Sequence, residues 1–277
     1  MRIKFWGVRG SIAISGPEFD RYGGATACVE VTGESGDTVI IDAGSGIRRL
    51  GQELAHRKTR SCHILFTHYH WDHILGFPFF SPIYSKNCAV LLTGAPHSLQ
   101  SVSAMIAKTM EPPNFPVPYT AVSASFSDSP MREAGFMAGG MKVEAVPLSH
   151  PNGGSGYKFT ENGRSLVFLT DNELGFRHEG GLTPAAYAKF CAGADLLVHD
   201  AEFKPEEYRH RKGWGHSSVD DAVRLALKCG AQRFALFHHN QDRTDDEIDE
   251  IVGYCREKAA PSGLGIFAAA ENMELEI

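Results

Sequence analysis

The 277-residue sequence predicts an α/β protein in which two mixed β-sheets pack on each other and helices cover their outer faces. Short β-branched and apolar runs alternate with helical patterns along most of the chain. Both halves of the chain begin with hairpins and continue with strands and helices in alternation, and no Gly/Ser-rich linker lies between them. We therefore expect a single domain over residues 1–277, long enough to bury a full hydrophobic core without disulfides.

The first half of the chain begins with strands. Alternating hydrophobicity at the N-terminus and several short β-branched or apolar runs, two of them separated by Gly33 and Gly36, are typical of strands. The predicted strands are Met1–Val8, Cys28–Thr32, Thr38–Ile41, His63–Phe66 and Ala89–Thr93. The predicted helices are Gly46–His56, the beginning of the apolar segment Ile74–Tyr84, and Ser98–Met110. Residues 111–120 are rich in proline and aromatic residues, so we expect an irregular loop there.

The second half repeats this organisation. Asn162-Gly163 between two β-branched runs is a strong hairpin signal. The predicted strands are Lys142–Pro147, Gly156–Thr160, Ser165–Leu169, Leu196–His199 and Phe234–Phe237. The predicted helices are the amphipathic segments Val219–Cys229 and Asp245–Lys258.

Composition excludes several classes of protein. The net charge of −6 is mild and is not that of a general nucleic-acid binder, and we interpret the basic clusters Arg48–Arg49 and 209–212 as solvated surface. No stretch approaches the roughly 20 apolar residues of a membrane-spanning helix, and residues 1–10 lack the pattern of a signal peptide. The six cysteines show no C-x-x-C spacing, so we expect reduced thiols in a cytoplasmic protein.

Polar side chains gather where predicted strands end. One group follows a single strand and consists of His68, His70, Asp72 and His73. The others each follow a different strand and are His150, Asp171, Asp200 and His238. Strand ends are where layered α/β folds hold ligands, and imidazole and carboxylate groups bind zinc, manganese or iron.

The spacing of the first group indicates two metal ions rather than one. In an extended turn His68 and His70 point the same way and can share one ion, whereas Asp72 and His73 lie where a helix begins and can reach a second. A bridging carboxylate is needed to hold two ions roughly 3.5–4 Å apart, and Asp171 is the natural candidate.

The segment Thr67-His68-Tyr69-His70-Trp71-Asp72-His73 resembles the H-x-H-x-D-H signature of the metallo-β-lactamase superfamily. Further segments match the family in its order along the chain, and they are Ile41–Gly44, Leu148–His150, Leu169–Asp171 and Leu236–His238. The resemblance extends over nearly the whole chain. It implies a four-layer αβ/βα sandwich.

The resemblance also implies a role for each site residue. One metal ion would be bound by His68, His70 and His150, and the other by Asp72, His73 and His238. Asp171 would bridge both ions and Asp42 would support a ligand. A water or hydroxide between the ions would be the nucleophile, with Asp72 among the catalytic residues. We expect two divalent ions, Zn²⁺ with Mn²⁺ or Fe²⁺ as alternatives.

Two further segments, Val198–Phe203 and Gly213–Ser218, resemble ribonuclease Z and its phosphodiesterase relatives. There a carboxylate orients a histidine that protonates the leaving oxygen or stabilises the phosphorane, and the corresponding residues here are Asp200 and His216. The chain departs from that pattern in having Asp200 where ribonuclease Z has Glu, and Glu202 where it has Thr. The alternative role for His216 is to cap the helix that begins near Ser217.

The substrate is predicted to be a small phosphodiester such as a cyclic nucleotide. Ribonuclease Z carries a long arm that grips transfer RNA between the two motifs that end here at His150 and Asp171, and only residues 151–170 separate them. The segments Phe5–Ser11 and Tyr22–Thr26 also resemble small bacterial phosphodiesterases of this fold. Phe115 and Tyr119 either roof the site and stack on a base or pack their loop onto the core, and the second is favoured.

Other functions remain as alternatives. They are an endoribonuclease of the ribonuclease Z type, a thioester or lactam hydrolase, a diiron oxidoreductase and a metal-bound sensor or scaffold. The thioester and lactam branches lack the Asp200–His216 pair, and the diiron enzymes usually carry Glu at the position of His70. A homodimer is possible, because Phe77, Phe79 and Phe80 would suit either an interface or the core.

The remaining histidines are expected to play no part in the site. His238 is preferred over the adjacent His239 as the ligand, and His199 is expected to point into the structure. The others match no motif, and they are His56, His63, His97, His178 and His210.

Overall fold

The computed structural model describes residues 1–94, 101–131 and 135–277. A first seven-stranded sheet combines the N-terminal half of the chain with the last strand. In spatial order its strands are β14 (Glu274–Glu276), β1 (Arg2–Gly7), β2 (Cys28–Thr32), β3 (Thr38–Ile41), β4 (Ser61–Phe66), β5 (Ala89–Gly94) and β6 (Ser125–Pro130). Pairing is antiparallel from β14 to β3 and parallel from β3 to β6.

A second seven-stranded sheet is built from the other half. In spatial order its strands are β13 (Gly265–Ala268), β12 (Arg233–Phe237), β11 (Leu196–Asp200), β10 (Arg164–Leu169), β9 (Ser155–Glu161), β8 (Met141–Pro147) and β7 (Phe136–Ala138). Pairing is parallel from β13 to β10 and antiparallel from β10 to β7. The prediction of two mixed sheets is confirmed.

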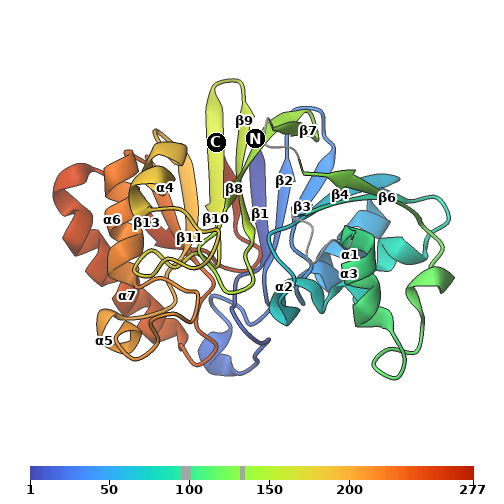
Figure 1. Cartoon of the computed structure of the whole chain (residues 1–277), viewed down its shortest axis with the longest axis horizontal. Helices are drawn as coiled ribbons and strands as arrows, with labels where there is room; N and C mark the ends of the chain where they lie inside the picture. Colours follow the sequence, from blue (N-terminus) through green and yellow to red (C-terminus); the bar gives the residue numbers. More distant parts are fainter. Residues whose placement is uncertain (95–100, 132–134) are drawn as a thin grey trace.

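Helices cover the two outer faces of this pair of sheets (Figure 1). Those beside the first sheet are α1 (Ile47–His56), α2 (Trp71–Ile74) and α3 (Val102–Ala107). Those beside the second are α4 (Pro184–Phe190), α5 (Pro205–Tyr208), α6 (Val219–Cys229) and α7 (Asp245–Ala259). Apolar side chains such as Phe5, Phe168 and Phe237 fill the space between the sheets, and separate apolar clusters lie beneath the helices of each face.

The sequence patterns located most elements but not all of them. The segment 74–84 does not begin a longer helix, because α2 ends at Ile74 and short 3-10 turns follow at Phe77–Phe79 and Ser81–Tyr84. Gly76, Pro78 and Pro82 explain this difference, since none of them suits a helix interior. The elements that the patterns did not reveal are β6, β7, β13, β14, α4 and α5. His97 and residues 98–100 of the predicted third helix lie outside the described residues.

The aromatic residues near α2 belong mostly to the core. Phe77 and Phe80 are fully buried, whereas Phe79 is exposed. Phe115 and Tyr119 pack against the apolar cluster beneath the first sheet, and the Tyr119 ring stacks on Phe77 with centroids 6.3 Å apart. The favoured prediction, that these two residues hold their loop onto the core, is confirmed.

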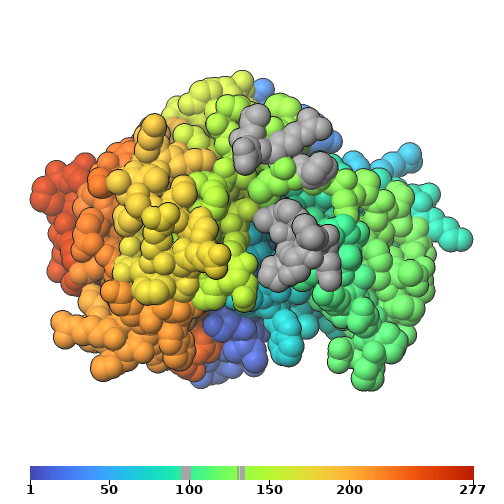
Figure 2. All heavy atoms as spheres, in the orientation of Figure 1, coloured from blue at the N-terminus to red at the C-terminus, as the bar shows by residue number. Residues whose placement is uncertain are grey.

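All six cysteines are free thiols and buried, as predicted. Among the helices of the described ranges, none combines the length and the apolar character needed to cross a membrane. Figure 2 shows the N-terminal half of the chain, in blue to green, and the C-terminal half, in yellow to red, meeting along one face of the molecule.

His63 gives the fold a calculable dependence on pH. It lies in β4, is buried, and shares a 2.8 Å hydrogen bond with Thr93 Oγ1, and burial lowers the pKa of His63 to about 4. Since this pKa lies below the unfolded value of about 6.5, the folded state binds fewer protons and loses stability as the pH falls. Relative to a His63→Gln variant, the wild-type free energy of unfolding should fall by about 2 kcal/mol between pH 7.5 and pH 5. Urea titrations of both proteins would measure this, and a pH-independent difference would contradict it.

Candidate metal centre

The side chains of the site lie at the carboxyl ends of strands from both sheets. Asp42 directly follows β3, Asp171 is the second residue after the end of β10, and His238 directly follows β12. All three have left-handed backbones, with φ values of 62°, 59° and 56°. This conformation is unusual for residues other than glycine, and it turns the chain sharply at the strand end.

The first predicted ligand group is assembled in space. Its ligand atoms lie within 4.8 Å of one another, and they come from His68, His70, His150 and Asp171. The Nε2 of His150 lies 3.0 Å from the Nδ1 of His70. The Nε2 of His68 is buried, has no hydrogen-bond partner and lies 3.5 Å from Oδ2 of Asp171.

The second predicted group is assembled beside it. Its ligand atoms also lie within 4.8 Å of one another, and they come from Asp72, His73, Asp171 and His238. Oδ2 of Asp72 lies 3.1 Å from Nε2 of His238 and 3.3 Å from Nε2 of His73. The Nε2 of His73, like that of His68, is buried without a hydrogen-bond partner.

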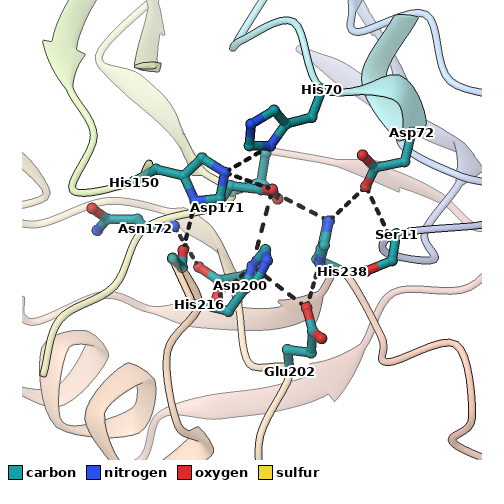
Figure 3. Close-up of polar contacts among 12 residues, drawn as sticks. Ser11, His70, Asp72, His150, Asp171, Asn172, Asp200, Glu202, His216 and His238 are labelled. Atoms are coloured by element: carbon teal, nitrogen blue, oxygen red, sulfur yellow. Dashed lines mark hydrogen bonds and ion pairs between the residues drawn. The ribbon is translucent and has the colours of Figure 1, made fainter. Parts of the chain in front are cut away.

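Asp171 lies between the two groups and divides its oxygens between them (Figure 3). Its Oδ2 faces His68 and His150, at 3.5 and 3.7 Å from their Nε2 atoms. Its Oδ1 faces His73 and His238, at 3.4 and 3.3 Å from theirs. This is the placement that a bridging carboxylate requires.

The residues present fit metal ions. Two ring nitrogens without hydrogen-bond partners point into clusters of carboxylate oxygens, a costly arrangement for buried polar atoms unless a cation joins them. Imidazole and carboxylate donors together suit zinc, manganese or iron. The structure therefore brings all seven predicted ligands together in two groups that could hold metal ions.

His73, His150 and His238 each use Nδ1, the ring nitrogen that faces away from the ligand groups, for a hydrogen bond to a carboxylate or carbonyl oxygen. His73 Nδ1 donates to Oδ2 of Asp42 at 2.8 Å, and Asp42 also accepts from the backbone N–H of Thr67 at 2.7 Å. His150 Nδ1 donates to the carbonyl oxygen of Gly215 at 2.8 Å. These contacts leave Nε2 of each ring free to face the site.

Glu202 is the acceptor for His238, with its Oε2 3.0 Å from Nδ1, and no role was predicted for it. It was noted only as a departure from the ribonuclease Z pattern. That departure was the signal that could have identified it.

The backbone approaches the metal centre closely at two glycines. A Cβ at Gly10 would lie 2.2 Å from Nδ1 of His238, and a Cβ at Gly215 would lie 2.2 Å from Nδ1 of His150. The N–H of Ser11 donates to Oδ2 of Asp72 at 2.8 Å. Any larger residue at either glycine would displace a ligand.

Burial and charge divide the histidines of the site. Burial lowers the pKa of His150 to about 3 and holds the pKa of His68 well below its usual value, so both rings are neutral, as metal ligands must be. Burial also lowers the pKa of His73 and His238, but neighbouring carboxylates, Asp171 foremost, outweigh it and raise both.

His216 lies beside both ligand groups. Its ring stacks on His238 with centroids 4.8 Å apart, and its buried Nδ1 lies 4.0 Å from Oδ2 of Asp171. It does not cap the following helix, because Ser218 Oγ accepts from the Asp221 N–H and fills that role.

Asp200 and His216 lie within ion-pair distance of each other but share no hydrogen bond. Oδ2 of Asp200 lies 3.8 Å from Nδ1 of His216, beyond hydrogen-bond distance, whereas Oε2 of Glu202 lies at 3.4 Å. The oxygens of Asp200 accept instead from the backbone N–H groups of Asn172 and Ser217, at 2.9 and 2.7 Å. The shorter side chain is thus held by backbone groups, and Glu202 is the nearer carboxylate.

The other histidines mostly follow the predictions. His239 belongs to neither ligand group and contacts the carbonyl oxygen of Ala269 at 2.8 Å, and His199 is buried against Asn172. His56 and His210 are exposed. His178 lies outside both ligand groups, and its Nε2 contacts Oε2 of Glu173 at 2.8 Å.

Comparisons with known proteins agree with this geometry. Residues 37–239 match a family model described as a beta-lactamase superfamily domain. Ribonuclease Z of Haloarcula marismortui is 24% identical over an alignment 302 positions long, which covers 93% of this chain and 91% of that protein.

Solved structures share the fold. The metallo-beta-lactamase fold protein YhfI from Bacillus subtilis has a TM-score of 0.70 at 15% identity, covering 100% of this chain and 99% of the other. A diphosphatase from the PhnP family has the same TM-score at 21% identity, covering 100% and 97%.

Proposed function

Because the chain belongs to the metallo-β-lactamase superfamily, in its ribonuclease Z/BN-like branch, we propose that this metal-dependent hydrolase cleaves small phosphodiesters with two bound divalent ions. The carrying observation is the position of Asp171, with one carboxylate oxygen toward each ligand group. Zinc is the metal we propose, since the two ligand groups contain five histidines.

The ions would be held by His68, His70 and His150 on one side and by Asp72, His73 and His238 on the other, with Asp171 shared. When bound, such ions lower the pKa of water and neutralise charge on a phosphoryl group.

The protein residues have their own parts in the reaction. Asp42 and Glu202 fix the rings of His73 and His238, so that Nε2 of each faces the site. His216 is placed to donate a proton to the departing oxygen, a step that the ligand residues do not provide. Its ring lies against His150 and His238, and its side chain is 12% exposed, so it lies between the metal centre and solvent.

A small substrate is supported by the segment between His150 and Asp171. It contains a short turn and the β9–β10 hairpin, so these described residues supply no arm to grip a large nucleic acid. The net charge of −6 agrees. A ribonuclease of the ribonuclease Z type is the second candidate, favoured by the similarity to the Haloarcula enzyme over most of both chains. The homodimer remains a prediction.

Elemental analysis followed by a substrate panel tests the proposal. We expect about two equivalents of zinc per chain. The protein should hydrolyse bis-p-nitrophenyl phosphate and a cyclic nucleotide, but neither a glutathione thioester nor a β-lactam. Chelation should abolish hydrolysis and re-addition of zinc should restore it. Preferential cleavage of transfer-RNA precursors would favour the second candidate, and metal binding without turnover of any substrate would favour a sensor.

A further inference from the structure

Glu173 is a buried carboxylate that forms no hydrogen bond to the side chain of any proposed metal ligand. Its side chain is almost fully buried, yet it accepts hydrogen bonds on both oxygens. Oε1 accepts from the hydroxyl of Tyr208 and the backbone N–H of Gly213, each at 2.7 Å. Oε2 accepts from the backbone N–H of Gly215 at 2.7 Å and from Nε2 of His178 at 2.8 Å.

These bonds hold the turn that carries His216. Gly213 and Gly215 have φ values of 89° and 100°, so the turn has a conformation that other residues rarely adopt. The carbonyl oxygen of Gly215 accepts from the ligand His150, and His216 is the next residue. Glu173 itself follows the bridging Asp171 by two residues, so one short segment contacts both the ligand groups and this turn.

We propose that Glu173 is a positioning residue that holds the 213–216 turn against the metal centre and so places His216 for proton donation to the leaving group. This inference rests on the proposed phosphodiesterase function. Glu173 touches neither ligand group, and it acts through the backbone of the turn and the ring of His216.

A Glu173→Gln substitution tests these hydrogen bonds, because all four partners of Glu173 are donors. Each carboxylate oxygen accepts from one backbone N–H, and a backbone N–H cannot become an acceptor. In Glu173→Gln, either orientation of the amide therefore puts its NH₂ group against the N–H of Gly213 or Gly215. The size of the side chain is kept, but the hydrogen bond to the N–H of either Gly213 or Gly215 is lost.

Steady-state kinetics with two substrates tests the role in catalysis. On a cyclic nucleotide, whose ribose alkoxide leaves poorly, Glu173→Gln should lower kcat by about a hundredfold and change KM little. On bis-p-nitrophenyl phosphate, whose leaving group needs no proton, kcat should stay within a few-fold of wild type. The double variant with His216→Ala should be no slower on the cyclic nucleotide than His216→Ala alone. Equal losses on both substrates, or additive losses in the double variant, would overturn the proposal.

Hydrogen–deuterium exchange provides a measurement that does not depend on turnover. Peptides containing residues 213–216 should exchange faster in Glu173→Gln, because the amide proton of either Gly213 or Gly215 loses its acceptor. Tyr208→Phe, which removes a single donor and introduces no mismatch, should show the same kinetic pattern with a smaller loss. Unchanged exchange in the turn would refute the positioning role, whether or not the wild type hydrolyses a phosphodiester. A wild type that hydrolysed no phosphodiester would count against the proposed function alone.

Asp195→Asn is the matched control. Asp195 is also a buried carboxylate that accepts from a backbone N–H, that of Ser165 at 2.8 Å, but it precedes β11 at the end opposite the metal centre. This variant should leave both substrates and exchange in the 213–216 turn unchanged.

Discussion

Replacing Asp171 with asparagine should lower kcat by on the order of a thousandfold and reduce the metal content below two ions per chain. The reason is geometric, since Oδ1 and Oδ2 face different ligand groups and are both needed as anions. The asparagine amide has one oxygen and one NH₂ group. One of the two ligand groups would therefore face a hydrogen-bond donor where it now faces a carboxylate oxygen. Metal analysis and steady-state kinetics on bis-p-nitrophenyl phosphate measure the two effects.

The control for this prediction is again Asp195→Asn, which neutralises a buried carboxylate away from the site. It should retain metal and activity. An Asp171→Asn protein that kept both ions and wild-type kcat would show that the carboxylate does not bridge, whatever the distances suggest.

The second large effect is expected at His216. Replacement with alanine should lower kcat on a cyclic nucleotide by about a hundred- to a thousandfold, within the range that general acids contribute. Hydrolysis of bis-p-nitrophenyl phosphate should fall by less than about tenfold, because p-nitrophenolate departs without a proton. Metal content should not change, since His216 is not one of the proposed ligands.

His210→Ala is the matched control, because His210 is an exposed histidine close in sequence to the same turn. It should have wild-type rates on both substrates. Wild-type rates for His216→Ala on the cyclic nucleotide would remove the leaving-group role, and equal losses on both substrates would point instead to damage at the metal centre.

The sequence predicted which histidines and aspartates lie together because much of the relevant pattern is local. His68, His70, Asp72 and His73 lie in one short segment, so an extended turn alone places them together. The other ligands each end a strand, and parallel strands present their carboxyl ends at one edge of the sheet.

Glu202 and Glu173 were missed because their partners are distant and partly backbone. Glu173 contacts N–H groups some 40 residues further along, and those groups face it only because Gly213 and Gly215 have left-handed backbones. No periodicity or spacing records such a contact. Asp200 was predicted from its position in a family pattern, but the pattern does not show that its oxygens accept from the N–H groups of Asn172 and Ser217.

The ligands also come from both halves of the chain. His68 and His73 follow a strand of the first sheet, whereas Asp171 and His238 follow strands of the second. Metal affinity and the docking of one half on the other are therefore thermodynamically linked, and each must strengthen the other by the same free energy. At a hundredfold excess over its dissociation constant, each ion would add about 2.7 kcal/mol to the cohesion of the halves. Scarcity of metal in the surroundings would thus weaken the architecture as well as stop the chemistry.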